Sequence, residues 1–175
     1  SGIYRGRLEA LNGVWEFVEH SSADYVVMSD CDIVTTIDYR DVVDFHVENG
    51  ADITVVTGKS FYDRSKGQSA SVIGTDENGR ITDVMVDPQI SGECNISLDM
   101  FVVSKEFLRQ IVVSSASRSQ YSFTKDILQA CKDEYKFMSY EHKGYFSKID
   151  TMIGYYEANM ALLDTENRNN LFIKS

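Results

Sequence analysis

The chain has 175 residues, of which 43% are hydrophobic and 25% are charged, a composition typical of one globular domain and not of a disordered or fibrous chain. Its formal net charge is −10, so there is no basic stripe to follow a phosphate backbone, and we expect no nucleic-acid partner. No apolar stretch approaches the ~18 residues of a membrane span, and three widely spaced cysteines match neither a disulfide framework nor a metal site, so we expect a cytoplasmic protein without a membrane partner.

The first third of the chain predicts a strand–helix–strand unit. Apolar residues at helical spacing predict an amphipathic helix over residues 5–19, and a short apolar run predicts a buried strand over 25–28. Asp38 is a suitable N-cap for a helix over 39–49, and the β-branched run over 51–57 predicts a second buried strand. This order and spacing are typical of a crossover unit on a parallel sheet.

The rest of the chain continues the alternation of strands and helices. Residues 59–69 are polar and predict a mobile loop, and Asn78-Gly79 predicts the turn of a hairpin between 70–75 and 80–86. Strands are also expected over 95–103, 135–140 and 145–149, helices directly after Ser104, over 124–134 and over 151–163, a serine-rich surface connection over 114–122, and a polar tail over 164–175. No internal repeat or domain boundary interrupts this pattern.

Asp30-Cys31-Asp32 directly follow the first predicted strand, and ligands of doubly wound sheets bind beyond the carboxyl ends of the strands. Carboxylates at such a point can hold Mg²⁺, which prefers oxygen ligands and bridges to phosphates. The same pattern fits the Asp-x-Asp with which many glycosyltransferases hold a nucleotide-sugar, and it also fits a solvated loop. The tripeptide alone leaves these three interpretations open.

The other reactive residue types form no constellation in the sequence. His46 follows Val42 and Val43 at helical spacing, which favours a packed core histidine over a catalytic one. No serine or cysteine is paired with a histidine in a recognisable way, and no P-loop is present. Tyr145 and Phe146 are able to stack on a sugar or a base, although core packing is the favoured interpretation.

Six motifs span the chain in a fixed order. They are Tyr4-Arg5-Gly6, Asp38-Tyr39, Asp44-Phe45-His46, Gly50-Ala51-Asp52-Ile53-Thr54, Thr75-Asp76-Glu77-Asn78-Gly79-Arg80-Ile81, and Gly144-Tyr145-Phe146 followed by Tyr156-Glu157-Ala158-Asn159-Met160. In order and spacing they resemble the nucleotidyltransferase domain of the glucose-1-phosphate adenylyltransferase (ADP-glucose pyrophosphorylase) family.

This resemblance implies an α/β fold of the Rossmann-like, GT-A-like type, with a mixed, mainly parallel sheet flanked by helices. It also implies a glucose-1-phosphate pocket, an ATP site and a pair of Mg²⁺ ions. Residues 1–175 are then expected to be a partial sugar nucleotidyltransferase domain, because the family's Gly-rich nucleotide loop and its C-terminal β-helix match no part of them.

The family's metal-binding positions are altered in this chain. Its first metal-binding aspartate falls on Cys31 or, with a one-residue insertion, on Asp32, and its second falls on Lys148. Lysine has no lone pair to give a metal when it is protonated. We therefore expect no metal cofactor, with Mg²⁺ at Asp30 and Asp32 only if the protein is an active enzyme.

The family's sugar-phosphate pocket is altered as well. The lysine that grips the sugar phosphate falls on Asp87, and two glycines that line the pocket fall on Ser71 and Asp99. At about 4 Å and an effective dielectric of about 20, exchanging attraction for repulsion at Asp87 changes the interaction with a phosphate by several kcal/mol before screening. We expect a vestigial sugar-phosphate pocket at these three residues, with Tyr4 and Arg5 on the nucleotide side.

This set of departures resembles the GlgD-type subunit of the family, a non-catalytic or weakly catalytic partner of the catalytic subunit in glycogen biosynthesis. We therefore expect a regulatory, non-catalytic subunit that forms a hetero-oligomer with the catalytic subunit and is also able to form a homo-oligomer. Three alternatives stay open. They are an active adenylyltransferase that makes ADP-glucose and pyrophosphate with Asp32 and with Lys59 or Lys148, a metal-dependent glycosyltransferase that uses Asp30 and Asp32, and a module that binds a sugar phosphate as an allosteric ligand.

Overall fold

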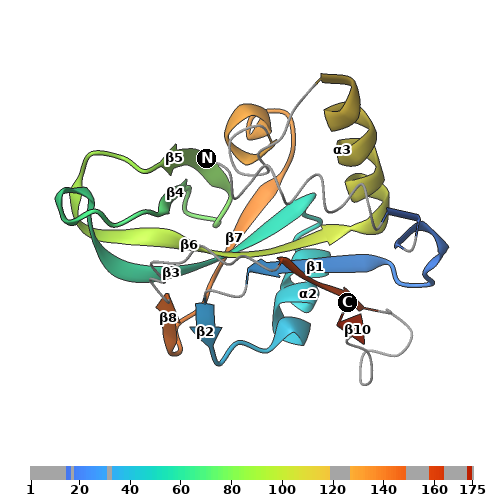
Figure 1. Cartoon of the computed structure of the whole chain (residues 1–175), viewed down its shortest axis with the longest axis horizontal. Helices are drawn as coiled ribbons and strands as arrows, with labels where there is room; N and C mark the ends of the chain where they lie inside the picture. The colour runs from blue at the N-terminus through green and yellow to red at the C-terminus, as the bar shows by residue number, and fades with distance from the viewer. Residues whose placement is uncertain are drawn as a thin grey trace.

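A central mixed sheet organises the protein in a computed structural model, which describes residues 15–16, 18–30, 33–118, 127–148, 158–163 and 173–174. The sheet has eight strands in the described residues, with the order β10-β9-β1-β6-β3-β7 and with the β4–β5 hairpin joined to β6 (Figure 1). These strands are β1 (Tyr25–Asp30), β3 (Ile53–Asp63), β4 (Ser71–Thr75), β5 (Ile81–Val86), β6 (Ser91–Ser104), β7 (Phe137–Glu141), β9 (Ala158–Leu163) and β10 (Ile173–Lys174). A separate two-stranded sheet pairs β2 (Ile33–Thr35) with β8 (Phe146–Lys148).

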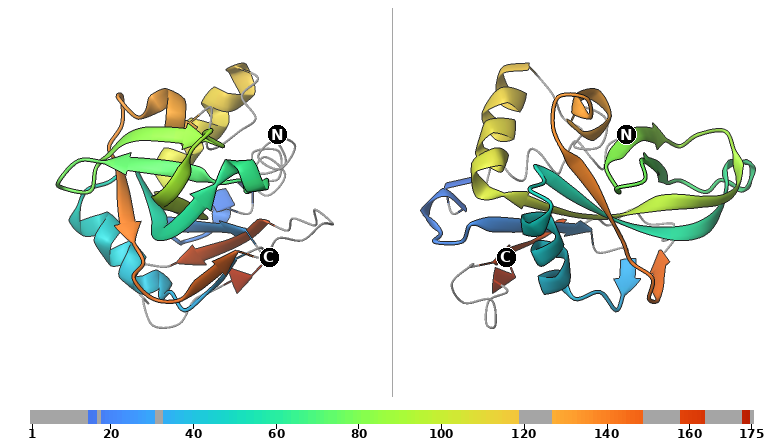
Figure 2. Two further views of the ribbon diagram at one scale, coloured as in Figure 1. Left: turned by 90° about the vertical axis from the view of Figure 1, so that its left-hand side faces the viewer. Right: turned by 180° about the vertical axis from the view of Figure 1, so that it is seen from behind.

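Helices lie on both faces of the sheet. Figure 2 shows α2 (Tyr39–Glu48) and α3 (Lys105–Arg118) on opposite sides of it. Successive residues of a strand point to opposite faces, so Val55 belongs to the hydrophobic core on the α3 side and Val56 to the core on the α2 side. The predicted α/β architecture, a mixed sheet flanked by helices, is confirmed. None of the helices in the described ranges is long and apolar enough to cross a bilayer.

Most strand pairs of this sheet are antiparallel, which differs from the expected parallel majority. β1 and β3 both pair antiparallel with β6, which lies between them, and in the described residues only β3 and β7 pair in parallel. The predicted strand–helix–strand unit is therefore present as β1–α2–β3, but its two strands are not neighbours. Local sequence patterns carry no signal for the insertion of β6, because strand order depends on residues far apart in the chain.

Helix α2 forms as its cap residues predict. The Asp38 carboxylate accepts a hydrogen bond from the Arg40 amide at 3.0 Å, which satisfies one of the free donors of the first turn. The Arg40 guanidinium also donates to this carboxylate and holds the pKa of Asp38 below its usual value. After the helix, Gly50 adopts the left-handed conformation (φ +56°) that ends it.

Three predicted elements are wrong in the described residues. The expected loop over 59–69 is strand β3 up to Asp63, followed by the short 3₁₀ helix η1 (Arg64–Lys66), because pairing with β6 continues to its end. The expected surface connection over 114–122 is helical as far as Arg118, and residues 158–163 of the expected C-terminal helix form strand β9. The first predicted helix is seen at residues 15–16 and 18–20, and its earlier part lies outside the described residues.

Candidate functional site

One of the two predicted metal positions, Lys148, lies on a strand that pairs with the segment following β1. Asp30 is the last residue of β1, and Cys31 and Asp32 lie outside the described residues. The chain resumes with β2, whose first residue, Ile33, pairs with Lys148 of β8. The backbone register therefore places Lys148 opposite the residue that directly follows Asp32, although 116 positions separate Asp32 from Lys148 in the chain.

A lysine at this point does not fit a site with two carboxylate ligands for Mg²⁺. A protonated ammonium offers three donors and no acceptor, and its positive charge repels a divalent cation. Among the residues that the structure describes, no group of three or more His, Cys, Asp or Glu side chains is arranged to hold a metal ion. Cys31 and Asp32 lie outside the described residues.

The small β2–β8 sheet is fastened to the main sheet through Gly58 and Phe146. A side chain at Gly58 would place its Cβ 2.4 Å from the Phe146 ring, so the ring lies directly on the glycine. Phe146 is packed against the core on the α2 side, which confirms the packing prediction. Tyr145 is 63% exposed, and its carbonyl accepts a hydrogen bond from the Thr36 amide at 3.3 Å. The core-packing prediction is therefore wrong for Tyr145.

Asp87 follows β5 at the base of the β4–β5 hairpin, and its carboxylate is held by the chain itself. Its Oδ1 accepts hydrogen bonds from the Ser69 hydroxyl at 2.7 Å and from the Ala70 amide at 3.0 Å. The Asp87 amide donates in return to the Ala70 carbonyl at 3.0 Å. At the turn of the same hairpin, the Ser139 amide of β7 donates to the Gly79 carbonyl at 2.8 Å. The hairpin is thus fixed to the rest of the fold at its turn and closed at its base.

Asp99 lies in an irregular part of the β3–β6 ladder. The register shifts between Val56 and Thr57, which pair with Met100 and Ser97, so that Leu98 and Asp99 are the additional residues of β6. Asp99 is 4% exposed and has φ +54°, a left-handed conformation that favours glycine. The glycine that the family resemblance expects here fits that conformation.

The structure brings the three predicted sugar-phosphate positions into one region. Ser71 begins β4, is buried, and pairs with Val86, the residue before Asp87. The pairing of Val72 with Ile96 places Ser71 alongside Ser97 in the antiparallel ladder, two residues before Asp99. Tyr4 and Arg5, the predicted nucleotide side, lie outside the described residues.

Tyr62 is a member of this region that the sequence does not indicate. It is almost fully buried, and its hydroxyl donates to the Pro88 carbonyl at 3.1 Å. Burial, with a further contribution from the Asp87 charge, raises the pKa of Tyr62. Residues 58–63 are the last part of β3. Because they are mostly polar, the sequence favours a loop there and does not indicate Tyr62 as a buried residue.

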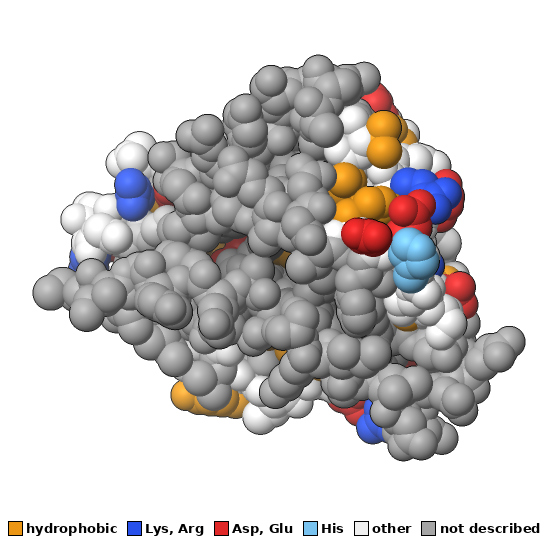
Figure 3. All heavy atoms as spheres, turned by 45° about the vertical axis from the view of Figure 1, so that its right-hand side comes forward, with side chains coloured by type: hydrophobic (Ala, Val, Ile, Leu, Met, Phe, Trp, Pro, Cys, Tyr) orange, Lys and Arg blue, Asp and Glu red, His pale blue; other side chains and the backbone are white. Residues whose placement is uncertain are grey.

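Lys59, which the active-enzyme alternative expects to bind phosphate, lies on β3, and its side chain approaches β7. Its side chain is 65% exposed, and its Nζ is 3.9 Å from a carboxylate oxygen of Glu141 in β7. An exposed pair at this distance contributes little to stability. On the face shown in Figure 3, basic side chains likewise lie beside acidic ones at the right-hand edge.

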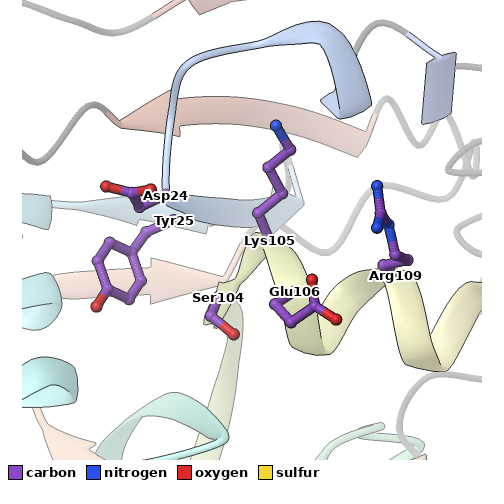
Figure 4. A pocket seen from close by; sticks show the side chains of 6 residues that line it. All are labelled: Asp24, Tyr25, Ser104, Lys105, Glu106 and Arg109. Carbon is purple, nitrogen blue, oxygen red and sulfur yellow. The ribbon is translucent and has the colours of Figure 1, made fainter.

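A surface hollow of about 630 Å³ lies at the opposite end of β1 from Asp30, where β1 begins and β6 ends. Figure 4 shows its lining, which consists of Asp24, Tyr25, Ser104, Lys105, Glu106 and Arg109. Both cations already have partners within the chain, since Lys105 donates to the Ser21 carbonyl and Arg109 to the Glu19 carboxylate. None of the lining residues belongs to the region around Asp87, so the hollow is a separate feature.

Comparison with known proteins identifies the family. Residues 4–165 match the model of the family described as nucleotidyl transferase. The chain belongs to this family. It is 26% identical over 162 residues to a glucose-1-phosphate adenylyltransferase of Lachnospira eligens and 28% identical over 161 residues to one of Thermosipho melanesiensis. The resemblance predicted from the six motifs is confirmed as a similarity to nucleotidyl transferases that carry this name.

These alignments cover 92% and 91% of this chain but 38% and 39% of the two relatives. The chain thus spans about two-fifths of the length of the curated relatives that it matches. Among solved structures, it is similar to the crystal structure of HddC from Yersinia pseudotuberculosis, with a TM-score of 0.60, 16% identity, and coverage of 78% of this chain and 56% of that one. At this identity the likeness shows the fold, and it agrees with the α/β nucleotidyl transferase architecture.

Proposed function

We propose that this protein is a regulatory, non-catalytic subunit of a cytoplasmic glucose-1-phosphate adenylyltransferase in glycogen biosynthesis, and that it acts by binding the catalytic subunit. The observation that carries this proposal is the state of Asp87. Where the resemblance expects a lysine that grips the sugar phosphate, a carboxylate stands, and Ser69 and Ala70 hold it in place. A carboxylate held in this way repels a phosphate at the point where a catalytic subunit attracts one.

The position of Lys148 supports the proposal independently. Lys148 pairs with Ile33, the residue that follows Asp32 in the sequence, and the resemblance expects a second metal-binding carboxylate where this lysine stands. Pyrophosphoryl transfer depends on the neutralisation of phosphate charge by metal ions and by lysine or arginine. The loss of both the lysine and a metal ligand is therefore expected to lower the rate by orders of magnitude.

The test uses the full-length protein and its catalytic partner, purified separately and together. Formation of ADP-glucose from ATP and glucose-1-phosphate is measured in the presence of Mg²⁺. We expect no turnover above background for this protein alone, a stable complex with the catalytic subunit, and a complex whose rate or effector response differs from that of the catalytic subunit alone.

A matched control is a catalytic subunit whose own phosphate-gripping lysine is exchanged for aspartate, which should lose activity in the same assay. Turnover by this protein alone at the level of an unaltered catalytic subunit would overturn the proposal in favour of an active enzyme. Failure of the two proteins to associate would overturn the regulatory role. Transfer from a nucleotide-sugar donor would instead support the glycosyltransferase alternative.

A further inference from the structure

The base of the β4–β5 hairpin contains donors that converge on a single oxyanion. The Ser69 hydroxyl and the Ala70 amide both point at Oδ1 of Asp87, at 2.7 and 3.0 Å. Asp87 adopts φ +49° to present its carboxylate there, a conformation that residues with a side chain rarely adopt. A single carboxylate oxygen therefore satisfies both donors at this point.

The segment before these two donors contains a cation and a buried phenol. The Arg64 guanidinium donates to the Gln68 carbonyl at 2.8 Å, directly before the segment that carries the two donors. The charges of Arg64 and Asp87 both act on the Tyr62 hydroxyl, in opposite directions, so both groups lie within electrostatic reach of it. A hydroxyl and a backbone amide that converge on one oxyanion, with a guanidinium on the adjoining segment, are groups with which proteins bind phosphate.

We propose that the Ser69 hydroxyl and the Ala70 amide form an anion-binding site for a phosphate group, and that Asp87 occupies it from within the chain. The carboxylate takes the hydrogen bonds that a phosphate oxygen would accept, and its charge repels a second anion. The inference deepens the proposed function, since it assigns to Asp87 the closure of a phosphate position and not merely the loss of a lysine.

Asp87→Gly tests the proposal in the full-length protein, with inorganic phosphate as the probe. Glycine adopts the left-handed conformation without strain, so the exchange removes the carboxylate and leaves the backbone shape. Calorimetric titration is expected to show phosphate binding at least about tenfold tighter than in the wild type, because each hydrogen bond to a charged group contributes about a factor of ten or more. Asp87→Asn is the matched control, since asparagine tolerates the same conformation and keeps an oxygen for both donors, and it should bind phosphate as weakly as the wild type.

Ser69→Ala assigns the binding to this site. Added to Asp87→Gly, it should remove most of the gain in phosphate affinity. Hydrogen exchange of peptides covering residues 64–72, followed by mass spectrometry, gives a readout that does not depend on affinity. Exchange in these peptides should be faster in Asp87→Gly, slower again with phosphate, and unchanged in Asp87→Asn.

Three results would each overturn the inference: phosphate binding by Asp87→Gly no tighter than by the wild type, equally tight binding by Asp87→Asn, or a gain that survives Ser69→Ala. If Asp87→Gly does not fold, Ser69→Ala in the wild-type background decides, because the closed base predicts faster exchange over residues 64–72 and unchanged exchange rejects it. Neither measurement requires turnover or a partner. A failed regulatory role and a failed anion site are therefore distinguishable.

Discussion

Asp87 and Asp99 are the residues of the described chain that combine a side chain with a positive φ. Both fall at positions where the sequence departs from the adenylyltransferase pattern. Left-handed backbone at non-glycine residues costs free energy and persists where the surrounding structure imposes it. At Asp99, the surrounding structure is the shifted ladder between β3 and β6. The backbone thus has a shape that suits the glycine that the family resemblance expects at this position.

This interpretation predicts the order of two substitutions at Asp99. Both Asp99→Ala and Asp99→Gly remove the buried carboxylate, but only alanine keeps a Cβ in the left-handed conformation. We expect Asp99→Ala to be less stable than Asp99→Gly by about 1–2 kcal/mol, the usual free-energy difference for that conformation. Urea denaturation of the two variants measures the difference.

Asp83 supplies the matched control for this comparison. It is an exposed aspartate in β5, and its φ is not positive. In an ordinary strand, glycine is less favourable than alanine by about 0.5–1 kcal/mol, so the order of the two variants should reverse. The same order at both positions would show that the conformation of Asp99 does not set its stability.

At the scale of elements, the contact between Gly58 and Phe146 joins β3 to the β2–β8 sheet that carries Lys148. Gly58→Ala would place a methyl group 2.4 Å from the Phe146 ring, so the ring and its strand must move. Overpacking of this kind typically costs about 1–3 kcal/mol. We expect the free energy of unfolding of Gly58→Ala to fall by about that amount, measured by chemical denaturation.

A compensating exchange tests whether the contact is the cause. Phe146→Leu replaces the flat ring with a smaller side chain, and in the Gly58→Ala background it should recover part of the lost stability. The single variant Phe146→Leu is the control, and it should be destabilised on its own because it loses buried contact area. If the two losses simply add in the double variant, Gly58 and Phe146 do not act through each other.

The elements that the sequence predicts correctly are those whose signals are local. Asp38 caps α2 and Asn78-Gly79 forms the turn between β4 and β5, because each depends on residues within a few positions. The last part of β3 is a strand because it pairs with β6, about 30 residues away. Its polar residues carry no local strand signal, and the sequence therefore predicts a loop there. Strand β9 pairs with β1, more than 120 positions earlier, and the apolar spacing in its sequence also suited a helix.

The residues of the candidate site also differ in whether the sequence alone indicates them. The family resemblance marks Asp87 and Asp99 by their position in the motifs. Closure of the hairpin brings Ser69 and Ala70 to the Asp87 carboxylate, which they hold by hydrogen bonds. No pattern in the sequence indicates these two residues. Their role becomes visible only when the two ends of the hairpin are seen side by side.

At the scale of the whole molecule, the side chain of His46 projects from α2 toward the central sheet. It is 2% exposed, its Nδ1 lies 2.7 Å from the Thr54 hydroxyl oxygen of β3, and the Tyr25 ring of β1 stands edge-on to it with the ring centres 5.6 Å apart. This confirms the predicted packed core histidine. Burial lowers the pKa of His46 to about 4, against a small opposing effect of the Asp52 charge. The imidazole is therefore neutral in the folded protein near neutral pH.

This burial couples the stability of the whole fold to pH. Below the ordinary histidine pKa of 6.5, His46 is protonated in the unfolded chain, whereas in the folded protein it stays neutral until about pH 4. The free energy of unfolding should therefore fall as the pH falls through this window, by up to about 3 kcal/mol, and should level off below it.

His46→Gln removes the titrating group and keeps a side-chain amide near Thr54, so its stability should depend less steeply on pH. Urea denaturation at pH 7, 6 and 5 compares the two slopes, with His20→Gln as the control because His20 is exposed. Equal slopes in the wild type and in His46→Gln would show that other groups cause the acid sensitivity.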